Sequence, residues 1–216
     1  MYIDAIVPAH NESLTIESVI ATLRGSFFVR RVIVVDDGSK DVTACRARNM
    51  GATVLRTAKN QGKGSAMLAG YQFSDSEYVG FFDADLLTLR VDHVDQLVTT
   101  CEQRALDMCC GLRDYGIWNP VQLMGPLITG ARVCSRKVLD AICADGWSGF
   151  AIETAMNDAA RRMGARVGCV MLEGLKIRNK TDKQGFVSGM RSHWKMAREI
   201  GRAENALKRT NGRSCS

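Results

Sequence analysis

The first half of the chain alternates short apolar runs with helical patterns, and this alternation restricts the fold more than any other feature. The apolar runs lie at Tyr2–Val7, Val32–Val35, Ala52–Arg56 and Tyr78–Phe82. Between them, apolar residues recur every three or four positions, as on one face of an amphipathic helix. Val32–Val35 contains only β-branched residues, which suits a strand buried on both faces. The pattern predicts an α/β fold with a mostly parallel sheet and crossover helices.

The second half of the chain is less regular. We expect a strand at Met108–Leu112, helices at Arg136–Ala144 and Phe150–Met163, and a last strand at Arg166–Leu172. Apolar residues recur at helical spacing between about Phe186 and Leu207, which predicts a C-terminal amphipathic helix.

The chain reads as one domain, because its 216 residues contain no internal repeat and no linker. We expect two halves of this domain at residues 1–90 and 91–175, followed by a basic helical tail at residues 176–216. No apolar run approaches the ~20 residues of a membrane span. The N-terminal residues lack the basic region of a signal peptide, so we expect a cytoplasmic protein. The eight cysteines include no CxxC pair and are expected to be reduced.

The charge is distributed unevenly along the chain. From Lys176 onward there are eleven Lys or Arg and three Asp or Glu, whereas residues 1–175 carry eighteen and twenty. The basic tail indicates an anionic partner, which is a phosphate, a membrane surface or a nucleic acid, or it is simply a solvated helix.

Polar residues follow three of the predicted strands. They are Pro8-Ala9-His10-Asn11-Glu12, Asp36-Asp37 and Asp83-Ala84-Asp85. Ligands of open α/β sheets bind outside the carboxyl ends of the strands, so the three clusters are expected to meet at one site.

Asp83-Ala84-Asp85 places two carboxylates one residue apart after a buried strand. Such neighbours repel each other unless a cation joins them. Oxygen ligands completed by phosphate and water suit Mg²⁺ or Mn²⁺. The alternative is a turn in which Asp83 caps a helix.

Asp36 and Asp37 can accept hydrogen bonds from a base or a ribose hydroxyl. The alternative is a strand-to-helix turn with Asp41 or Ser39 as the N-cap. Lys63 lies between two glycines, and it therefore combines a cation with the close backbone approach that a diphosphate needs.

Four motifs in this order and spacing resemble the nucleotide-binding half of the family 2 glycosyltransferases of GT-A fold. They are IVPAHNE, VIVVDDGSKD, NQGKGSAMLAG and FFDADL. The chain is similar in style to dolichyl- or polyprenyl-phosphate sugar transferases and to glucosyl-phosphoglycerate synthases. The resemblance is strong over about residues 2–90 and loose over 127–153, through LITGARV and GFAIE.

The resemblance implies a nucleotide-sugar site formed by Pro8, Ala9, Glu12, Asp36, Asp37, Lys63, Asp83 and Ala84. Asp37 would face the base and Lys63 would lie beside the diphosphate. Residues 1–90 would be the donor half and residues 91–175 the acceptor half. His10 would lie beside the nucleoside.

The resemblance also implies a divalent metal, Mg²⁺ or Mn²⁺, held by Asp83 and Asp85. His193 is a candidate third ligand, or a plain residue beside Trp194. Asp85 and Glu153 are the candidate catalytic residues. Glu153 or Asp158 would be a general base if the acceptor is a hydroxyl, whereas a phosphate acceptor requires none. The alternative for Glu153 is a surface carboxylate.

The implied function is metal-dependent sugar transfer from a nucleoside diphosphate sugar to an anionic acceptor, either polyprenyl phosphate or a small phosphorylated molecule. Many lipid-directed relatives carry C-terminal membrane helices that this chain lacks, so membrane contact would be peripheral, through the tail. The alternatives are transfer to nucleic acid, an inactive nucleotide-binding module and a nucleotidyltransferase. The last is disfavoured because Pro8–Glu12 replaces its glycine-rich first loop.

Overall fold

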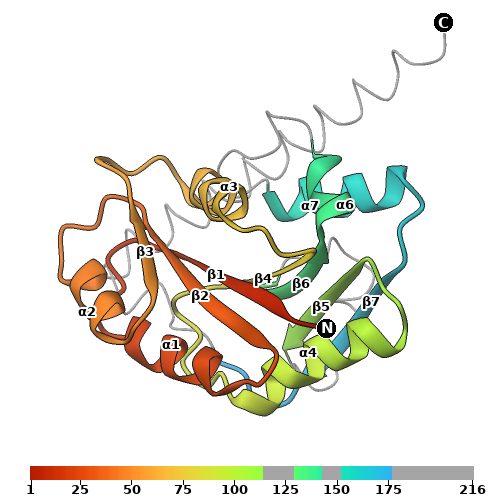
Figure 1. Cartoon of the computed structure of the whole chain (residues 1–216), viewed down its shortest axis with the longest axis horizontal. Coiled ribbons are helices and arrows are strands. Elements are labelled where there is room, and N and C mark those ends of the chain that lie inside the picture. Colours follow the sequence, from red (N-terminus) through yellow and green to blue (C-terminus); the bar gives the residue numbers. More distant parts are fainter. Residues whose placement is uncertain (114–128, 143–151, 177–216) are drawn as a thin grey trace, which may run out of the picture.

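A computed structural model describes residues 1–113, 129–142 and 152–176, and its centre is a seven-stranded sheet with helices on both faces (Figure 1). The strands are β1 (Ile3–Ala9), β2 (Val29–Asp36), β3 (Thr53–Arg56), β4 (Tyr78–Phe82), β5 (Met108–Arg113), β6 (Ala131–Ser135) and β7 (Val167–Leu172). The helices are α1 (Ile16–Gly25), α2 (Thr43–Asn49), α3 (Lys63–Phe73), α4 (Val91–Gln103), α6 (Arg136–Asp140) and α7 (Ile152–Arg162).

The sheet is mostly parallel, as the sequence predicts. Its strand order is β3-β2-β1-β4-β6-β5-β7. β1 pairs in parallel with β2 and β4, β2 with β3, and β5 with β7. Only β6 runs antiparallel, against β4 and β5, among the strands of the described ranges.

Two apolar layers hold the helices against the sheet. α1 and α4 cover one face, and α3, α6 and α7 cover the other (Figure 1). Val32–Val35 faces both layers and is at most 3% exposed. The prediction of a strand buried on both faces is therefore confirmed.

The largest difference from the sequence-based expectation is β6, which the apolar pattern did not predict. Its second residue is Arg132, a charged residue that interrupts the apolar run but is only 1% exposed. The expected helix from Arg136 to Ala144 is shorter than predicted, because α6 ends at Asp140. α1 begins at Ile16 rather than near residue 13, because a turn closed on the Glu12 carbonyl comes first.

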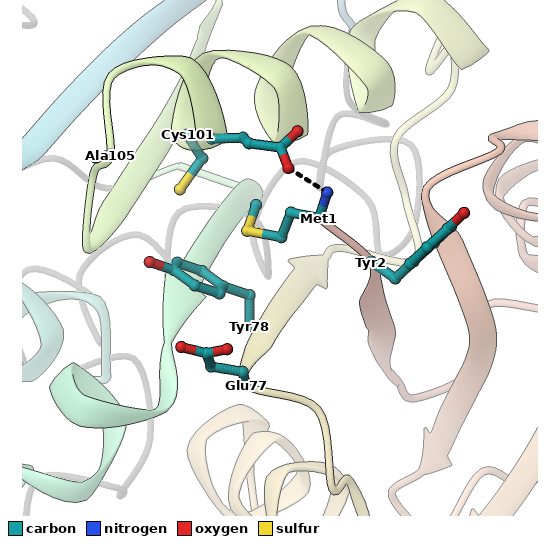
Figure 2. A pocket seen from close by; sticks show the side chains of 7 residues that line it. Met1, Tyr2, Glu77, Tyr78, Cys101 and Ala105 are labelled. Atoms are coloured by element: carbon teal, nitrogen blue, oxygen red, sulfur yellow. Dashed lines mark hydrogen bonds and ion pairs between the residues drawn. The ribbon is translucent and has the colours of Figure 1, made fainter.

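The amino edge of the sheet carries a small cavity of about 360 Å³ (Figure 2). Met1 and Tyr2 line it at the start of β1, and Glu77 and Tyr78 line it at the start of β4. The N-terminal amine forms an ion pair with Glu102 of α4. The cavity lies at the edge opposite the carboxyl ends of the parallel strands, where the polar motifs lie.

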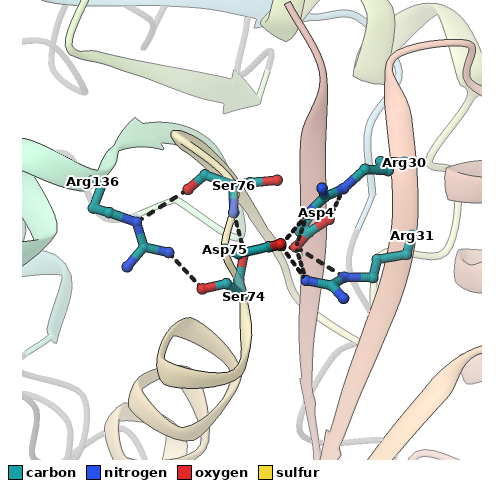
Figure 3. Close-up of polar contacts among 7 residues, drawn as sticks. All are labelled: Asp4, Arg30, Arg31, Ser74, Asp75, Ser76 and Arg136. Carbon is teal, nitrogen blue, oxygen red and sulfur yellow. Dashed lines mark hydrogen bonds and ion pairs between the residues drawn. The ribbon is translucent and has the colours of Figure 1, made fainter.

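The same edge holds an ion-pair network around the buried carboxylate of Asp4, which we call the Asp4 cluster (Figure 3). Asp4 is fully buried and accepts hydrogen bonds from Arg30 (3.1 Å to each oxygen), Arg31 (3.0 and 2.8 Å) and Ser74 (2.7 Å). Asp75 pairs with both arginines. The network ties β1 to β2 and to the segment between α3 and β4.

Several predictions fall outside the described residues. They are the C-terminal amphipathic helix, nearly all of the basic tail and His193. Among the residues that the structure does describe, no helix is long and apolar enough to cross a membrane. The described cysteines are free thiols, and most of them are buried, although Cys45 is exposed.

Candidate active site at the carboxyl edge

The carboxyl ends of β1, β2 and β4 lie side by side. Ala9 pairs with Asp36 at the ends of β1 and β2, and Ile6 of β1 pairs with Phe81 of β4. The polar residues that follow these three strands therefore lie along one edge, where α/β sheets bind ligands.

At this edge Lys63 joins two carboxylates that are far apart in the sequence. Its Nζ lies 2.7 Å from Asp83 Oδ1 and 2.6 Å from Glu153 Oε1. Lys63 is the first residue of α3, Asp83 follows β4, and Glu153 is in the first turn of α7. Three separate elements thus contribute to one charged group, which we call the Lys63 cluster.

Burial and charge act in opposite directions on this cluster. Burial by itself would lower the pKa of Lys63, but Asp83 and Glu153 outweigh it and raise this pKa. Burial raises the pKa of Asp83, and the negative charges of Asp85 and Glu153 add to that increase while Lys63 opposes it. Burial would also raise the pKa of Glu153, but Lys63 and Arg132 reverse the effect and lower it. The cluster thus favours the ionised form of Glu153 and disfavours that of Asp83.

Glu153 is not a surface carboxylate. It is 3% exposed, and its Oε2 has no hydrogen-bond partner among the described residues. A buried carboxylate oxygen without a donor costs free energy. Such an atom is therefore suited to a ligand that brings a donor or a cation.

Arg132 is a member of this neighbourhood that sequence reasoning missed. It lies on β6 and lowers the pKa of Glu153 by its charge. Its Nη1 is 3.5 Å from the sulfur of Met156, which shares α7 with Glu153. The only sequence signal was a single arginine inside the LITGARV motif.

Asp83 and Asp85 supply oxygen ligands only, which suits Mg²⁺ or Mn²⁺. No group of three or more His, Cys, Asp or Glu side chains in the described part of the chain forms a ready metal cage. Two carboxylates completed by phosphate and water fit such an ion better than a closed protein site. Gly130 leaves room for Asp83, since a Cβ at Gly130 would lie 2.8 Å from Asp83 Oδ2.

The residues expected around the nucleoside lie at the ends of β1 and β2. Pro8 is half-buried, and Ala9 and Glu12 are buried. Asp36 is fully buried, and its Oδ1 accepts the Ser39 amide (3.2 Å). Arg56 Nε lies 3.0 Å from Asp36 Oδ2, at ion-pair distance but not aligned as a hydrogen bond.

A groove of about 790 Å³ opens beside these residues. Its lining comes from the segments that follow β1, β2 and β3, namely His10, Gly38, Ser39, Lys40, Arg56, Thr57, Ala58, Lys59 and Asn60. His10 lies on its wall with Nδ1 2.7 Å from the Asp37 carbonyl oxygen. Because of its size and its place at the carboxyl edge of the sheet, this groove is a candidate for the nucleoside side of a donor.

Asp158 and Asp41 both have partners within the protein. Asp158 pairs with Arg161 (2.6 Å) and Arg162 (2.8 Å) on its own helix, so its charge is already compensated. Asp41 accepts the backbone amides of Ser13 (3.2 Å) and Thr43 (3.0 Å) and holds the start of α2.

Known proteins resemble this chain in sequence. A 4,4'-diaponeurosporenoate glycosyltransferase of Staphylococcus aureus (strain MRSA252) is 37% identical over 98 residues, which is 43% of this chain and 26% of that protein. A dolichyl-phosphate beta-glucosyltransferase of Dictyostelium discoideum is 26% identical over 183 residues, 72% of this chain and 55% of that protein. The chain thus spans between about a quarter and about half of these curated relatives.

Solved structures share the fold. Glucosyl-3-phosphoglycerate synthase from Mycobacterium tuberculosis, crystallised with Mn²⁺, uridine diphosphate and glucosyl-3-phosphoglycerate, superposes with a TM-score of 0.78. The identity is 24%, and the match covers 95% of this chain and 79% of that one. The same synthase with Mg²⁺ and uridine diphosphate gives a TM-score of 0.77. The predicted GT-A fold is therefore confirmed.

The family is shown directly by the sequence. Residues 4–151 match the family model described as glycosyl transferase family 2, which is well over half of the chain. The family that the four motifs resemble is thus confirmed, and the protein belongs to glycosyl transferase family 2.

Proposed function

We propose that the protein transfers a sugar from a nucleoside diphosphate sugar to an acceptor with the help of a divalent metal. The observation that carries this proposal is the Lys63 cluster at the carboxyl edge of the sheet. One half-buried ammonium lies between two carboxylates there. Charges of both signs in one place suit a ligand that also has both, namely a diphosphate with its cation.

Asp83 and Asp85 would hold the metal, which the Mn²⁺ and Mg²⁺ complexes of the M. tuberculosis synthase support. When bound, the metal neutralises negative charge on the leaving nucleoside diphosphate. His193 stays a predicted third ligand, since it lies outside the described residues.

Lys63 would contact the diphosphate, while Pro8, Ala9, Glu12 and Asp36 would surround the nucleoside. The ammonium would then exchange part of its contact with Asp83 for phosphate oxygens. Since the fold neighbours bind uridine diphosphate, uridine diphosphate sugars are the first donors to test.

Glu153 would face the acceptor. For a hydroxyl acceptor, its carboxylate would take the hydroxyl proton as the new bond to the sugar forms. Lys63 and Arg132 lower the pKa of Glu153, which keeps it ionised but also makes it a weaker base.

We propose an acceptor that carries a phosphate. The relatives named for dolichyl phosphate and phosphoglycerate support this class, and so does the excess of eight positive charges from Lys176 onward. A polyprenyl phosphate would bring the tail to a membrane surface, whereas a small phosphorylated acceptor would not. Transfer to polyprenyl phosphate in vesicles and to 3-phosphoglycerate in solution separates the two.

The testing experiment is a thermal-shift screen of nucleoside diphosphate sugars with Mn²⁺, Mg²⁺ or chelator, because a bound ligand stabilises the folded state. At least one donor should raise the melting temperature only with metal. Stabilisation by no donor, or equal stabilisation in chelator, would contradict the proposed function.

A further inference from the structure

The Asp37 carboxylate faces the chain's own backbone rather than open solvent. Asp37 follows β2 and is 3% exposed. Its Oδ1 accepts the Gln61 amide at 2.9 Å, and its Oδ2 accepts the Gly62 amide at 2.7 Å. The Thr57 hydroxyl lies 3.0 Å from Oδ1. Both carboxylate oxygens are thus engaged by the segment that leads from β3 into α3.

The backbone of Asp37 is fixed as well. Its amide donates to the Ala9 carbonyl at 2.8 Å. Its carbonyl oxygen is 2.7 Å from His10 Nδ1, and His10 Nε2 is 3.1 Å from the Asn11 side-chain nitrogen. A His10 tautomer with its proton on Nδ1 satisfies both contacts. Asp37 therefore joins the ends of β1 and β2 to the glycine-rich loop.

The two loops also approach each other closely. A Cβ on Gly38 would lie 2.7 Å from the Lys59 carbonyl carbon and 2.8 Å from the Asn60 nitrogen. Gly62 has a φ of 100°, a conformation that favours glycine. α3 begins at the next residue, Lys63, and no side chain at its N-cap accepts a helical amide.

We propose that Asp37 is a positioning residue, which fixes the Gln61–Gly62 backbone and thereby aims Lys63 and the start of α3 at the donor diphosphate. This inference rests on the proposed function and deepens it. It differs from the role that the sequence resemblance implies, in which Asp37 faces the base. In the proposed role Asp37 governs the phosphate end of the donor whatever the base.

The test compares ligands with and without a base. In Asp37→Asn, one acceptor oxygen becomes an NH₂ donor that faces a backbone amide. We expect binding of inorganic pyrophosphate with Mn²⁺ and of uridine diphosphate with Mn²⁺ to weaken by the same factor, about tenfold or more. Weaker uridine diphosphate binding with unchanged pyrophosphate binding would overturn the proposal and assign Asp37 to the base.

Hydrogen exchange tests the same idea without any ligand. The Gln61 and Gly62 amides should exchange about tenfold faster in Asp37→Asn than in the wild type. Unchanged exchange at both amides would overturn the proposal. Because this arm needs no donor, it still decides the role of Asp37 if the proposed function fails.

Two further variants guard against a general loss of structure. Thr57→Val removes the hydroxyl that lies 3.0 Å from Asp37 Oδ1 and 2.9 Å from the Lys59 carbonyl oxygen. It should weaken pyrophosphate and uridine diphosphate binding alike, by about threefold. Asp41→Asn alters a carboxylate that also holds backbone amides, but in a loop that does not lead to Lys63. It should leave pyrophosphate binding within about twofold, because Ser13 and Thr43, which Asp41 holds, are not among the residues that Asp37 holds. An equal loss in Asp41→Asn would overturn the specific link between Asp37 and Lys63.

Discussion

The two charge clusters at opposite edges of the sheet differ in how fully their carboxylates are hydrogen-bonded. In the Asp4 cluster, two arginines and Ser74 donate to a single buried carboxylate (Figure 3). In the Lys63 cluster, a single ammonium is shared by Asp83 and Glu153. Glu153 Oε2 also lacks a hydrogen-bond partner among the described residues.

This difference indicates that the Asp4 cluster stabilises the fold, whereas the Lys63 cluster is suited to binding a ligand. A buried carboxylate whose oxygens all accept hydrogen bonds from the protein has no acceptor left for a ligand, so it contributes to the fold. An undersatisfied cluster costs stability until a ligand arrives, which is the usual condition of a binding site. We therefore expect substitutions in the Asp4 cluster to change stability and those at the carboxyl edge to change binding and catalysis.

The largest effect is expected at the metal site. Asp85→Ala should lower sugar transfer by about a thousandfold or more, since a lost metal contact removes several kcal/mol of transition-state stabilisation. The melting temperature of the ligand-free protein should change little. Initial rates over a range of Mn²⁺ concentrations check this, and near-normal transfer by the variant would remove Asp85 from the metal site.

In the Asp4 cluster, Asp4→Ala should lower the free energy of unfolding by about 2 kcal/mol, because a buried and fully hydrogen-bonded carboxylate is lost while the partly exposed Arg30 and Arg31 keep Asp75 as a partner. Urea denaturation measures this change. The matched control is Asp75→Ala, whose side chain is 73% exposed and which should cost below about 1 kcal/mol. Similar losses of unfolding free energy in the two variants would mean that the burial of Asp4 does not determine how much it stabilises the fold.

Lys63→Met should act on metal and donor with opposite signs. In the wild type, the ammonium competes with a metal for Asp83, so the variant should bind Mn²⁺ alone about tenfold more tightly. The same variant should bind uridine diphosphate with Mn²⁺ more weakly, because the diphosphate loses its cation. Calorimetry measures both, with Lys59→Met as the control for an exposed cation of the groove. Weaker binding of Mn²⁺ alone would contradict the competition.

The smallest expected effect is a pH dependence of the Asp4 cluster. Burial by itself would raise the pKa of Asp4, but the hydrogen bonds from Arg30, Arg31 and Ser74 lower it below its ordinary value. A lowered carboxyl pKa gives stability that is present above the unfolded pKa, near 3.9, and is lost as the pH falls through the folded pKa. The stability difference between the wild type and Asp4→Asn should therefore be constant near neutral pH and shrink below about pH 4. Urea denaturation across this range checks the trend, and a difference that grows in acid would contradict it.

The sequence predicts the first half of the fold well, because its strands are apolar runs of uniform pattern. The predicted strand at Tyr78–Phe82 has the same bounds as β4. β6 escapes prediction because Arg132 is buried by tertiary contacts that no local pattern reveals. Sequence spacing also brings Asp83 and Asp85 together, since they are neighbours in the chain.

The rest of the candidate site depends on long-range contacts. Lys63 and Glu153 are 90 residues apart, and only the sheet brings them within 2.6 Å. The resemblance predicts that Asp37 faces the base, whereas its hydrogen bonds to the Gln61 and Gly62 amides are seen only in the folded chain. The sequence pattern thus predicts which edge of the sheet carries the site. The partner of each charged side chain can be identified only in the folded structure.

The most direct test of the Lys63 cluster as a donor and metal site is a calorimetric titration of uridine diphosphate into the full chain, with Mn²⁺ and with chelator. Binding should be at least about tenfold tighter with Mn²⁺, because metal and diphosphate neutralise each other's charge. Asp85→Ala should lose this dependence, and Asp75→Ala should keep it. Equal affinity in Mn²⁺ and in chelator, or an unchanged metal dependence in Asp85→Ala, would contradict the assignment of the carboxyl edge as a metal–diphosphate site.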